Sequence, residues 1–262
     1  MLPLPASVGL HCASGAGGLA VTALQCFNLM SAFSEASSPT PYSKFAEEAG
    51  TSPSAAVIGG RAGMLVIYAP ALAASAFFAA NSPSVNGREA LCASLLAAHF
   101  GKRVLETLFL HIYSGSVSAA LSGMIGAFYA LVASLIVFTQ RAVPAELYAG
   151  ATPSVGLACF AVGLAGNLYH HQLLASQRSA SKARYVVPTG GLFDYCTMPH
   201  YLFEVLGWIG IALVAQQLNA FLVSLGMASY LGGRAVSTTK WYVQKFGPDY
   251  PASRRHIVPF VF

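Results

Sequence analysis

Four polar or ionisable residues lie inside an apolar stretch that otherwise has the composition of a membrane span. Their spacing of i, i+3, i+4 and i+7 places them on one face of a helix: His99, Lys102, Arg103 and Glu106. Because ionisable groups at membrane depth are expensive, they normally point into a protein interior and serve a site. The stripe therefore predicts a catalytic or binding role. The alternative is an ion pair between Lys102 and Glu106 that only holds helices together.

A second group of polar residues follows in the last third of the chain. Asn167, His171 and Arg178 are spaced i, i+4 and i+11 and would share one helical face. After a basic connection and a Gly-Gly turn, a further helix carries its own polar face, formed by His200, Tyr201, Glu204 and Trp208. Two polar faces at the membrane boundary suit a ligand with a charged head and an apolar partner. The basic tail, 240–262, fits phosphate groups and anionic lipid headgroups equally well.

Composition indicates that membrane helices carry these faces. The chain is 55% hydrophobic and 9% charged, whereas soluble domains are about 25% charged. Crossing a bilayer takes about 20 apolar residues, and stretches of that kind occur at 8–32, 59–80, 90–113, 117–139, 153–175 and 202–236. The last is too long for one crossing, and Gln216, Gln217 and Asn219 divide it into a hairpin. The sequence predicts an all-α polytopic membrane protein with about seven transmembrane helices.

The basic residues predict an orientation for these helices. With seven spans and the N-terminus outside, ten Lys and Arg residues face the cytoplasm and two face the other side, as the positive-inside rule requires. We therefore expect a cytoplasmic C-terminal segment. The same distribution accounts for the formal charge of +5, so nucleic-acid binding is not expected. Scattered cysteines and histidines predict neither a disulfide framework nor a metal site.

Two blocks near the C-terminus resemble the steroid 5-alpha-reductase family. They are YVVPTGGLFDYCTMPHYLFEVLGWIG, residues 185–210, and WYVQKFGPDYPASRRHIVPFVF, residues 241–262. The resemblance covers 167–262, which we expect to be the NADPH-binding part of one membrane domain, 1–262. It implies NADPH-dependent reduction of a carbon–carbon double bond conjugated to a carbonyl in a lipid substrate. It also implies an endoplasmic-reticulum membrane, contact with membrane lipids, and association with other membrane enzymes of lipid synthesis.

The same resemblance implies a set of cofactor-binding residues. These are Asn167, His171, Arg178, Tyr185, His200, Glu204, Arg234, Tyr242 and Arg254. Two of them depart from the family pattern. His171 stands where steroid reductases carry Asp, and His200 stands where they carry Asn.

The substrate-facing residues leave two reductase classes open. Steroid reductases carry a Gln-Glu pair before a Pro on the second helix, whereas this chain has Ile67 and Tyr68 there. By contrast, the stretch 99–111 is similar to very-long-chain trans-2-enoyl-CoA reductases, in which the matching Lys and Tyr are the proposed catalytic pair. The residues expected to catalyse are therefore Lys102, Tyr201 and Glu106, and those expected to contact substrate are Tyr68, Arg103 and Trp208.

The chemistry of conjugate reduction explains these residue types. Hydride added to the β-carbon drives negative charge onto the carbonyl oxygen, which needs a donor or a cation, and the α-carbon then takes a proton. Tyr201 is expected to be the acid and Lys102 its electrostatic partner. Other classes fit less of the sequence. Membrane methyltransferases that use S-adenosylmethionine share a C-terminal helix with Pro, His, Tyr and Glu, but the P-x-G-G-L-F block favours the reductases. A transporter or scaffold would not explain the polar cluster.

Overall fold

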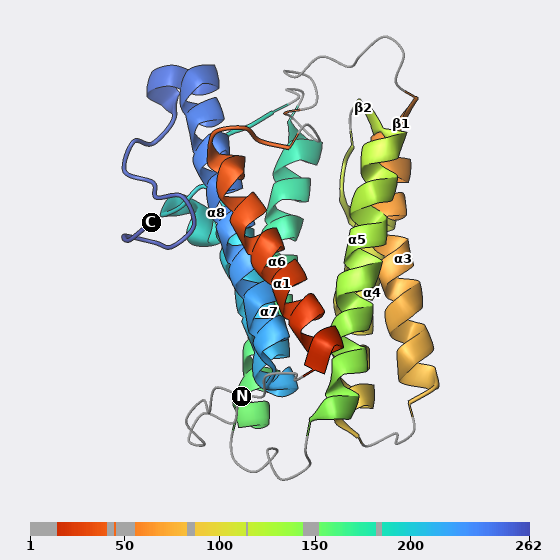
Figure 1. Cartoon of the computed structure of the whole chain (residues 1–262). Helices are drawn as coiled ribbons and strands as arrows, with labels where there is room; N and C mark the ends of the chain where they lie inside the picture. The colour runs from red at the N-terminus through yellow and green to blue at the C-terminus, as the bar shows by residue number, and fades with distance from the viewer. Residues whose placement is uncertain are drawn as a thin grey trace.

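The computed structural model describes residues 15–40, 45, 56–82, 87–113, 115–143, 152–181 and 185–262. These residues form long helices joined by short connections (Figure 1). The helices are α1 (Gly15–Ala32), α3 (Gly60–Ala80), α4 (Arg88–Leu105), α5 (Ala119–Phe138), α6 (Thr152–Ala180), α7 (Pro199–Ala215) and α8 (Leu218–Phe246). Residues 8–14 of the first predicted span, and most of the polar connection after Thr40, lie outside the described ranges.

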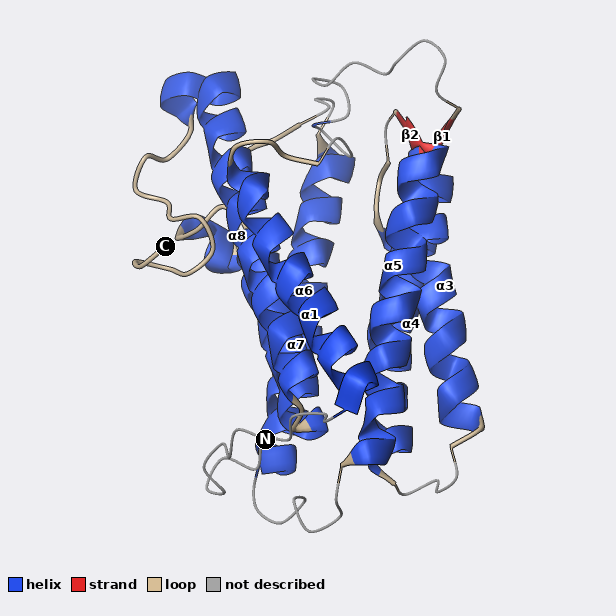
Figure 2. Ribbon diagram, viewed as in Figure 1, coloured by secondary structure: helices blue, strands red, loops and turns tan. Residues whose placement is uncertain are grey.

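Short elements complete the described fold. Two strands, β1 (Val57–Gly59) and β2 (Ser116–Ser118), pair antiparallel with Ile58 opposite Val117, and join the starts of α3 and α5. Figure 2 shows how small this ribbon is beside the helices. The remaining turns are η2 (Phe33–Ala36), η3 (Glu106–Leu110), η4 (Thr139–Ala142), η6 (Gly191–Asp194) and η7 (Gly247–Asp249). The prediction of a mainly helical protein is confirmed.

Three described helices are long and apolar enough to cross a membrane. They are Gly15–Ala36, Gly60–Ala80 and Ala119–Ala142. The other predicted spans also correspond to helices, and the long stretch 202–236 is indeed divided, because α7 ends at Ala215 and α8 begins at Leu218. Gln216 at the break has φ +50°, in the left-handed region that ends helices. A total of seven crossings and a cytoplasmic C-terminus remain predictions.

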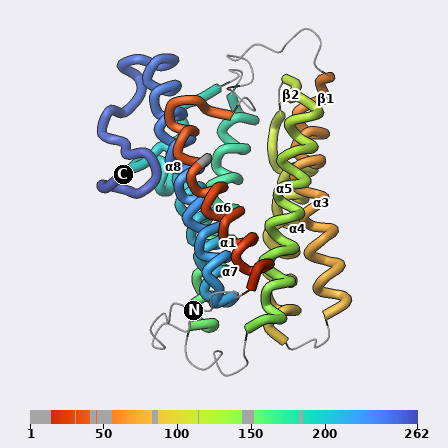
Figure 3. The backbone as a smooth tube through the Cα atoms, in the orientation of Figure 1, coloured from red at the N-terminus to blue at the C-terminus, as the bar shows by residue number. Residues whose placement is uncertain are grey.

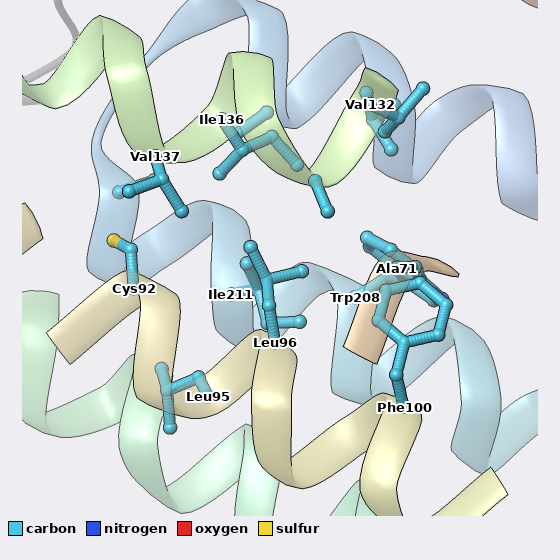
Figure 4. Close-up of a cluster of buried hydrophobic side chains, with 14 of the residues drawn as sticks. Ala71, Cys92, Leu95, Leu96, Phe100, Val132, Ile136, Val137, Trp208 and Ile211 are labelled. Atoms are coloured by element: carbon cyan, nitrogen blue, oxygen red, sulfur yellow. The ribbon is translucent and has the colours of Figure 1, made fainter. Parts of the chain in front are cut away.

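The helices form two groups that face each other (Figures 1 and 3). One group contains α3, α4 and α5; in the other, α7 packs between α6 and α8, and α1 lies along α8. Figure 4 shows the apolar core between the groups, where Leu96 and Phe100 of α4 meet Ile136 of α5 and Ile211 of α7. This core fixes α4 against α7, two of the three helices that carry the predicted polar faces.

Glycines allow α6 and α7 to approach closely. A Cβ atom added at Gly163 would lie 2.5 Å from the backbone nitrogen of Gly207, and one added at Gly156 would lie 2.8 Å from the carbonyl oxygen of Gly210. Small residues at such contacts are typical of membrane helix pairs. The close contact brings Asn167 of α6 within hydrogen-bond reach of the start of α7, where its side-chain nitrogen donates to the His200 carbonyl at 2.8 Å.

One predicted helix has a different ending from the one expected. The stretch 90–113 was predicted as one continuous span, but the α-helix ends at Leu105 and continues as a π-helical turn, η3. The His111 N–H donates to the Glu106 carbonyl at 2.8 Å, an i to i+5 bond that widens the turn. π-Turns occur frequently at functional sites. Hydrophobicity alone gave no signal of this change, because the turn is as apolar as the helix before it.

Candidate active site

A cavity of about 280 Å³ lies between the two helix groups. Its walls come from α3, α4, α5, α6, α7 and α8, from β2, and from the connection after η3. A second cavity of about 250 Å³ adjoins it. Both cavities are lined by His111, Ile112, Leu174, Arg178, Tyr185, His200 and Tyr201. Ligand pockets of about 300 Å³ or more usually hold small molecules, so the joined space suits one or two ligands.

The polar faces predicted from spacing meet at the first cavity. Asn167, His171 and Arg178 line it from α6. From α7 come the four residues His200, Tyr201, Glu204 and Trp208, and from α3 and α4 come Tyr68 and Arg103. Residues far apart in the chain therefore line one cavity, called the chamber below, as their common helical faces predicted.

A buried ion-pair cluster around Glu106 supports the wall of this chamber. Glu106 is 3% exposed. Its Oε1 atom accepts from Lys102 Nζ at 2.8 Å and from His171 Nδ1 at 3.0 Å, and its Oε2 atom accepts from Arg103 Nη1 at 2.7 Å. Lys102 also donates to the side-chain oxygen of Asn167. The cluster joins η3 and α4 to α6 through charged hydrogen bonds, which are the stronger kind.

The two cations of this cluster have different positions. Arg103 lines the main cavity, where its Nη2 atom donates to the Tyr68 hydroxyl at 2.7 Å. Lys102 instead lines a small pocket of about 10 Å³, with His99 and Glu204 among its neighbours. The ion pair that the sequence offered as a purely structural alternative is therefore present. Lys102 reaches the main cavity through Glu106 and Asn167.

The same cluster contains a set of atoms that could in principle ligate a metal. Ligand atoms of Glu106, His111 and His171 lie within 4.8 Å of one another. However, the Glu106 carboxylate is already bound by Lys102 and Arg103, and two adjacent positive charges oppose a metal cation. We assign these atoms to the ion-pair cluster.

The second cavity has the character of a site for anionic groups. Arg178 and Lys245 both lie over the ring of Tyr185, at 5.6 and 5.2 Å from its centre. Two buried polar atoms in its wall have no hydrogen-bond partner among the described residues: His200 Nδ1 and Thr238 Oγ1. Buried polar atoms are normally hydrogen-bonded, so these atoms indicate the place of a polar ligand.

Two residues predicted to bind the cofactor are engaged by the protein itself. Arg234 lines the second cavity, yet its Nη1 atom donates to Glu35 Oε1 at 2.7 Å and to the Thr40 carbonyl at 3.2 Å. Arg254 lines neither cavity, and its Nη1 atom donates to the Pro188 carbonyl at 2.7 Å. Because Pro188 lines the second cavity, Arg254 supports that wall from behind. Tyr242, the remaining member of the set, lines the second cavity directly.

The connection between α6 and α7 is fixed at several points. His170 Nδ1 donates to the Gly166 carbonyl at 2.7 Å, and its Nε2 atom accepts from the Leu192 N–H at 3.2 Å. Gly190 and Gly191 have φ of +83° and +56°, values that favour glycine. The turn at Gly190 and Gly191, which was predicted from the sequence, thus leads directly into η6, a few residues before the start of α7.

The C-terminal tail holds the other side of this connection. Thr197 N–H donates to the Arg255 carbonyl at 2.8 Å, and Met198 N–H donates to the His256 carbonyl at 3.0 Å. The Thr197 hydroxyl also shares a hydrogen bond of 2.6 Å with the Tyr250 hydroxyl. Burial raises the pKa of Tyr250 above its usual value, so this hydroxyl stays protonated. These bonds set the position of His200 and Tyr201, which follow directly.

Some residues that line the two cavities were not predicted from the sequence. Tyr230 lines the first cavity and Thr238 the second. With Arg234 and Tyr242 they recur every four residues along α8, which is the signal that would have found them. His99 belongs to the predicted polar stripe but has no individual role in that prediction. Its Nε2 atom lies 3.3 Å from Glu204 Oε1, and its ring packs 5.1 Å from that of Trp208.

Comparisons with known proteins bear on this site. The profile of the family described as 3-oxo-5-alpha-steroid 4-dehydrogenase matches residues 106–262. This range is more than half of the chain and includes Glu106, the polar faces of α6 and α7, and the tail. The chain belongs to the steroid 5-alpha-reductase family. The family resemblance read from residues 185–210 and 241–262 is thereby confirmed.

Individual members of the family match to different extents. Steroid 5-alpha-reductase DET2 of Solanum lycopersicum is 38% identical over 108 residues, covering 41% of this chain and 42% of that protein. The 3-oxo-5-alpha-steroid 4-dehydrogenase 2 of Sus scrofa is 28% identical over 235 residues, covering 86% of this chain and 89% of that protein. The human 3-oxo-5-alpha-steroid 4-dehydrogenase 2 is 34% identical over 109 residues, 42% of each chain. The chain therefore spans less than half the length of two of these three relatives.

Proposed function

We propose that this chain reduces a carbon–carbon double bond conjugated to a carbonyl in a lipid, with NADPH as reductant. The names of its relatives favour a 3-oxo-4-ene steroid as the substrate class. The observation that carries the proposal is the junction of the two cavities, where His200, Tyr201 and Arg178 line both the first cavity, with its aromatic walls, and the second. A reductase of this kind needs an apolar substrate and an anionic cofactor at one point.

The residues of the second cavity fit a phosphorylated dinucleotide. Arg178, Tyr185 and Tyr242 would hold it, with Lys245 nearby, because arginine and lysine form charge-assisted hydrogen bonds with phosphates. The unpartnered His200 Nδ1 and Thr238 Oγ1 would find their partners on the same ligand. When bound, the reduced nicotinamide supplies a hydride.

The residues of the first cavity fit an apolar carbonyl compound. Met64, Phe100, Tyr129 and Trp208 provide apolar and aromatic walls, which exclude water from the reacting atoms. Tyr201 is half-buried at the junction and is proposed to give its proton to the α-carbon, as a general acid. The proposed role of Lys102 is electrostatic and acts through Glu106. Glu106 in turn holds His171 and Arg103 in the wall of the first cavity.

We further propose that the protein lies in the endoplasmic-reticulum membrane with the cytoplasmic C-terminus predicted from its basic residues. In this orientation the second cavity, proposed to hold the cofactor, would open on the side where nicotinamide cofactors are abundant. Contact with membrane lipids and with other lipid-synthesis enzymes belongs to the same proposal. The three apolar helices long enough to cross a bilayer support the membrane location.

A second substrate class, the very-long-chain trans-2-enoyl thioesters, remains a candidate because of one position. Tyr68 lines the cavity where the sequence comparison expects a glutamate in steroid reductases. Both substrates have the same conjugated carbonyl, so the same residues would serve either one. The two candidates differ in the group beyond the carbonyl, a fused ring or a long acyl chain.

A substrate panel tests these proposals directly. Purified protein would be incubated with NADPH and, separately, a 4-ene-3-oxosteroid, a trans-2-enoyl-CoA and a polyprenal, with product identified by mass spectrometry. We expect consumption of NADPH with the steroid and addition of two hydrogens to its ring. A second tube would contain S-adenosylmethionine and a prenylated cysteine. Methyl transfer in that tube, with no reduction of the steroid, the enoyl-CoA or the polyprenal, would overturn the reductase proposal.

A further inference from the structure

A small pocket beside the first cavity is lined by two side chains of opposite charge that do not contact each other. The pocket has a volume of about 10 Å³ and lies between α4, α6 and α7, with Lys102 and Glu204 in its wall. Among the described residues, no hydrogen bond or ion pair joins Lys102 to Glu204. Glu204 also lines the first cavity. The pocket therefore separates a cation from a carboxylate that belongs to the chamber.

Lys102 has one donor more than the acceptors around it. A lysine ammonium group carries three N–H donors. Within the described part of the chain, two of them are used, by Glu106 Oε1 at 2.8 Å and by the side-chain oxygen of Asn167. The Lys102 side chain is only 10% exposed, and buried polar groups are normally hydrogen-bonded. The third donor therefore needs an acceptor in the pocket that Lys102 lines.

Glu204 likewise has acceptor capacity that its neighbours do not fill. An ionised carboxylate can accept about four hydrogen bonds. In the part of the chain that the structure describes, its contact is with His99, whose Nε2 atom lies 3.3 Å from Oε1. The Glu204 side chain is only 14% exposed, and a buried charge that lacks donors is costly. The pocket thus suits a ligand that accepts from Lys102 and donates to Glu204.

We propose that this pocket is a binding site for one water molecule, which accepts a hydrogen bond from Lys102 and donates one to Glu204. A single water needs a cavity of roughly 10–15 Å³ and at least two polar partners, and the pocket provides both. Water has the donor and the acceptor that the two side chains require. Lys102 is thereby a positioning residue for the carboxylate of Glu204, through a path that does not involve Glu106.

Gly207 provides a way to displace this water. It is buried in α7 and lines the same pocket. Apart from its chain neighbours and its own helix backbone, no atom would lie within 4 Å of a Cβ added there, so Gly207→Ala puts a methyl group into the pocket without a clash. Gly123→Ala is the matched control. Gly123 lies within α5 and has equally open surroundings, but it is exposed and lines neither this pocket nor the two cavities.

Thermal unfolding in detergent distinguishes a water site from an empty space. Alanine favours a helix over glycine, and filling an empty space adds contacts. An empty pocket therefore predicts that Gly207→Ala raises the melting temperature at least as much as Gly123→Ala. Loss of the water instead leaves Lys102 and Glu204 each short of a partner, and we expect the melting temperature of Gly207→Ala to fall by about 4–8 °C.

The same substitution in a Lys102→Met background shows whether the loss comes from the water. Without the lysine donor the water is no longer held between two charged groups, so Gly207→Ala should cost much less there. An equal loss in both backgrounds would indicate a steric cause and overturn the proposal. A melting temperature of Gly207→Ala at or above that of Gly123→Ala would also overturn it.

A crystal structure at a resolution that shows ordered water provides the direct test. We expect water density within hydrogen-bond distance of Lys102 Nζ and of a Glu204 carboxylate oxygen. Its absence would overturn the proposal, even if Gly207→Ala failed to fold. Neither readout requires activity, so the water site and the reductase function can fail separately.

The effect of the water on catalysis rests on the proposed function. Glu204 is among the residues predicted to bind the cofactor, whereas the proposed acid, Tyr201, does not line this pocket. Gly207→Ala should therefore raise the KM for NADPH more than it lowers kcat, measured with the 4-ene-3-oxosteroid. An unchanged KM in this variant would overturn the positioning role of Lys102.

Discussion

Replacing Glu106 by Gln tests whether the buried charge cluster holds the helix groups together. The substitution keeps the size of the side chain but removes the negative charge that Lys102 and Arg103 share at 2.8 and 2.7 Å. Their side chains are only 10% and 14% exposed, so water can replace the lost partner only in part. We expect Glu106→Gln to destabilise the protein strongly.

The magnitude follows from the surroundings of each cation. Removing one partner of a buried ion pair typically costs about 3–5 kcal/mol. Arg103 retains its hydrogen bond to Tyr68, and Lys102 retains Asn167, so the lower end, about 3 kcal/mol, applies here. For a chain of this length, about 3 kcal/mol corresponds to a fall in melting temperature of about 6–12 °C.

Thermal unfolding of the purified protein in detergent, followed by circular dichroism, measures this change. Glu89→Gln is the matched control, because Glu89 binds Arg141 at 2.7 Å but the Arg141 side chain is 48% exposed. Ion pairs with one partner this exposed contribute little to stability, because water solvates the charge. The control variant should therefore unfold within a few degrees of the wild type.

A third variant shows whether charge is the cause. Adding Lys102→Met to Glu106→Gln removes one of the two unbalanced cations, so the double variant should be more stable than Glu106→Gln alone. If Glu106→Gln were no more destabilising than Glu89→Gln, or if the double variant lost still more stability, the cluster would not act as a buried charge balance and the reasoning would be refuted.

Four further expectations address catalysis, the cofactor, the tail and topology. Tyr201→Phe should lower kcat by roughly 10²-fold or more with nearly intact NADPH affinity; near-normal turnover would exclude it as the acid. Arg178→Ala should weaken NADPH binding, measured by fluorescence titration, by about 1.5–3 kcal/mol. Arg254→Ala should weaken it less, because Arg178 lines the cavities whereas Arg254 only supports Pro188. A larger effect of Arg254→Ala than of Arg178→Ala would contradict this geometry. Burial lowers the pKa of His256 below its usual value, so as pH falls through about 6.5 the unfolded chain takes up a proton that the folded chain resists. Stability should therefore decrease, and His256→Gln should reduce that decrease in melting curves between pH 7.5 and 5.5. A glycosylation acceptor fused to the C-terminus should remain unmodified in cells, and its efficient modification would contradict the cytoplasmic orientation.

Periodicity predicted the parts of the site that depend on a single helix. The spacing of Asn167, His171 and Arg178 placed them on one face of α6, and all three line the first cavity. The polar residues in the middle of 202–236 predicted the break at Gln216. In both cases the pattern repeats within one element, so helix geometry alone decides the outcome.

Features that depend on contacts between distant segments could not be predicted in the same way. The pairing of Glu35 with Arg234 joins residues 199 positions apart, and neither residue has a local pattern that names the other. Lys102 and Arg103 are adjacent in sequence, yet only Arg103 lines the main cavity. Which of two neighbouring side chains enters a cavity depends on how α4 is rotated against α6 and α7, and packing sets that rotation.

The pairing of residues 197–198 with 255–256 has a consequence for biosynthesis. The backbone carbonyls of Arg255 and His256 fix the segment just before His200 and Tyr201. The ribosome adds these two residues after it has made all the helices from α1 to α8, because they follow α8 in the sequence. Those helices can be made and inserted while the start of α7 still lacks this support. A chain that terminates between α8 and residue 255 would therefore carry these helices without the backbone bonds that position His200 and Tyr201.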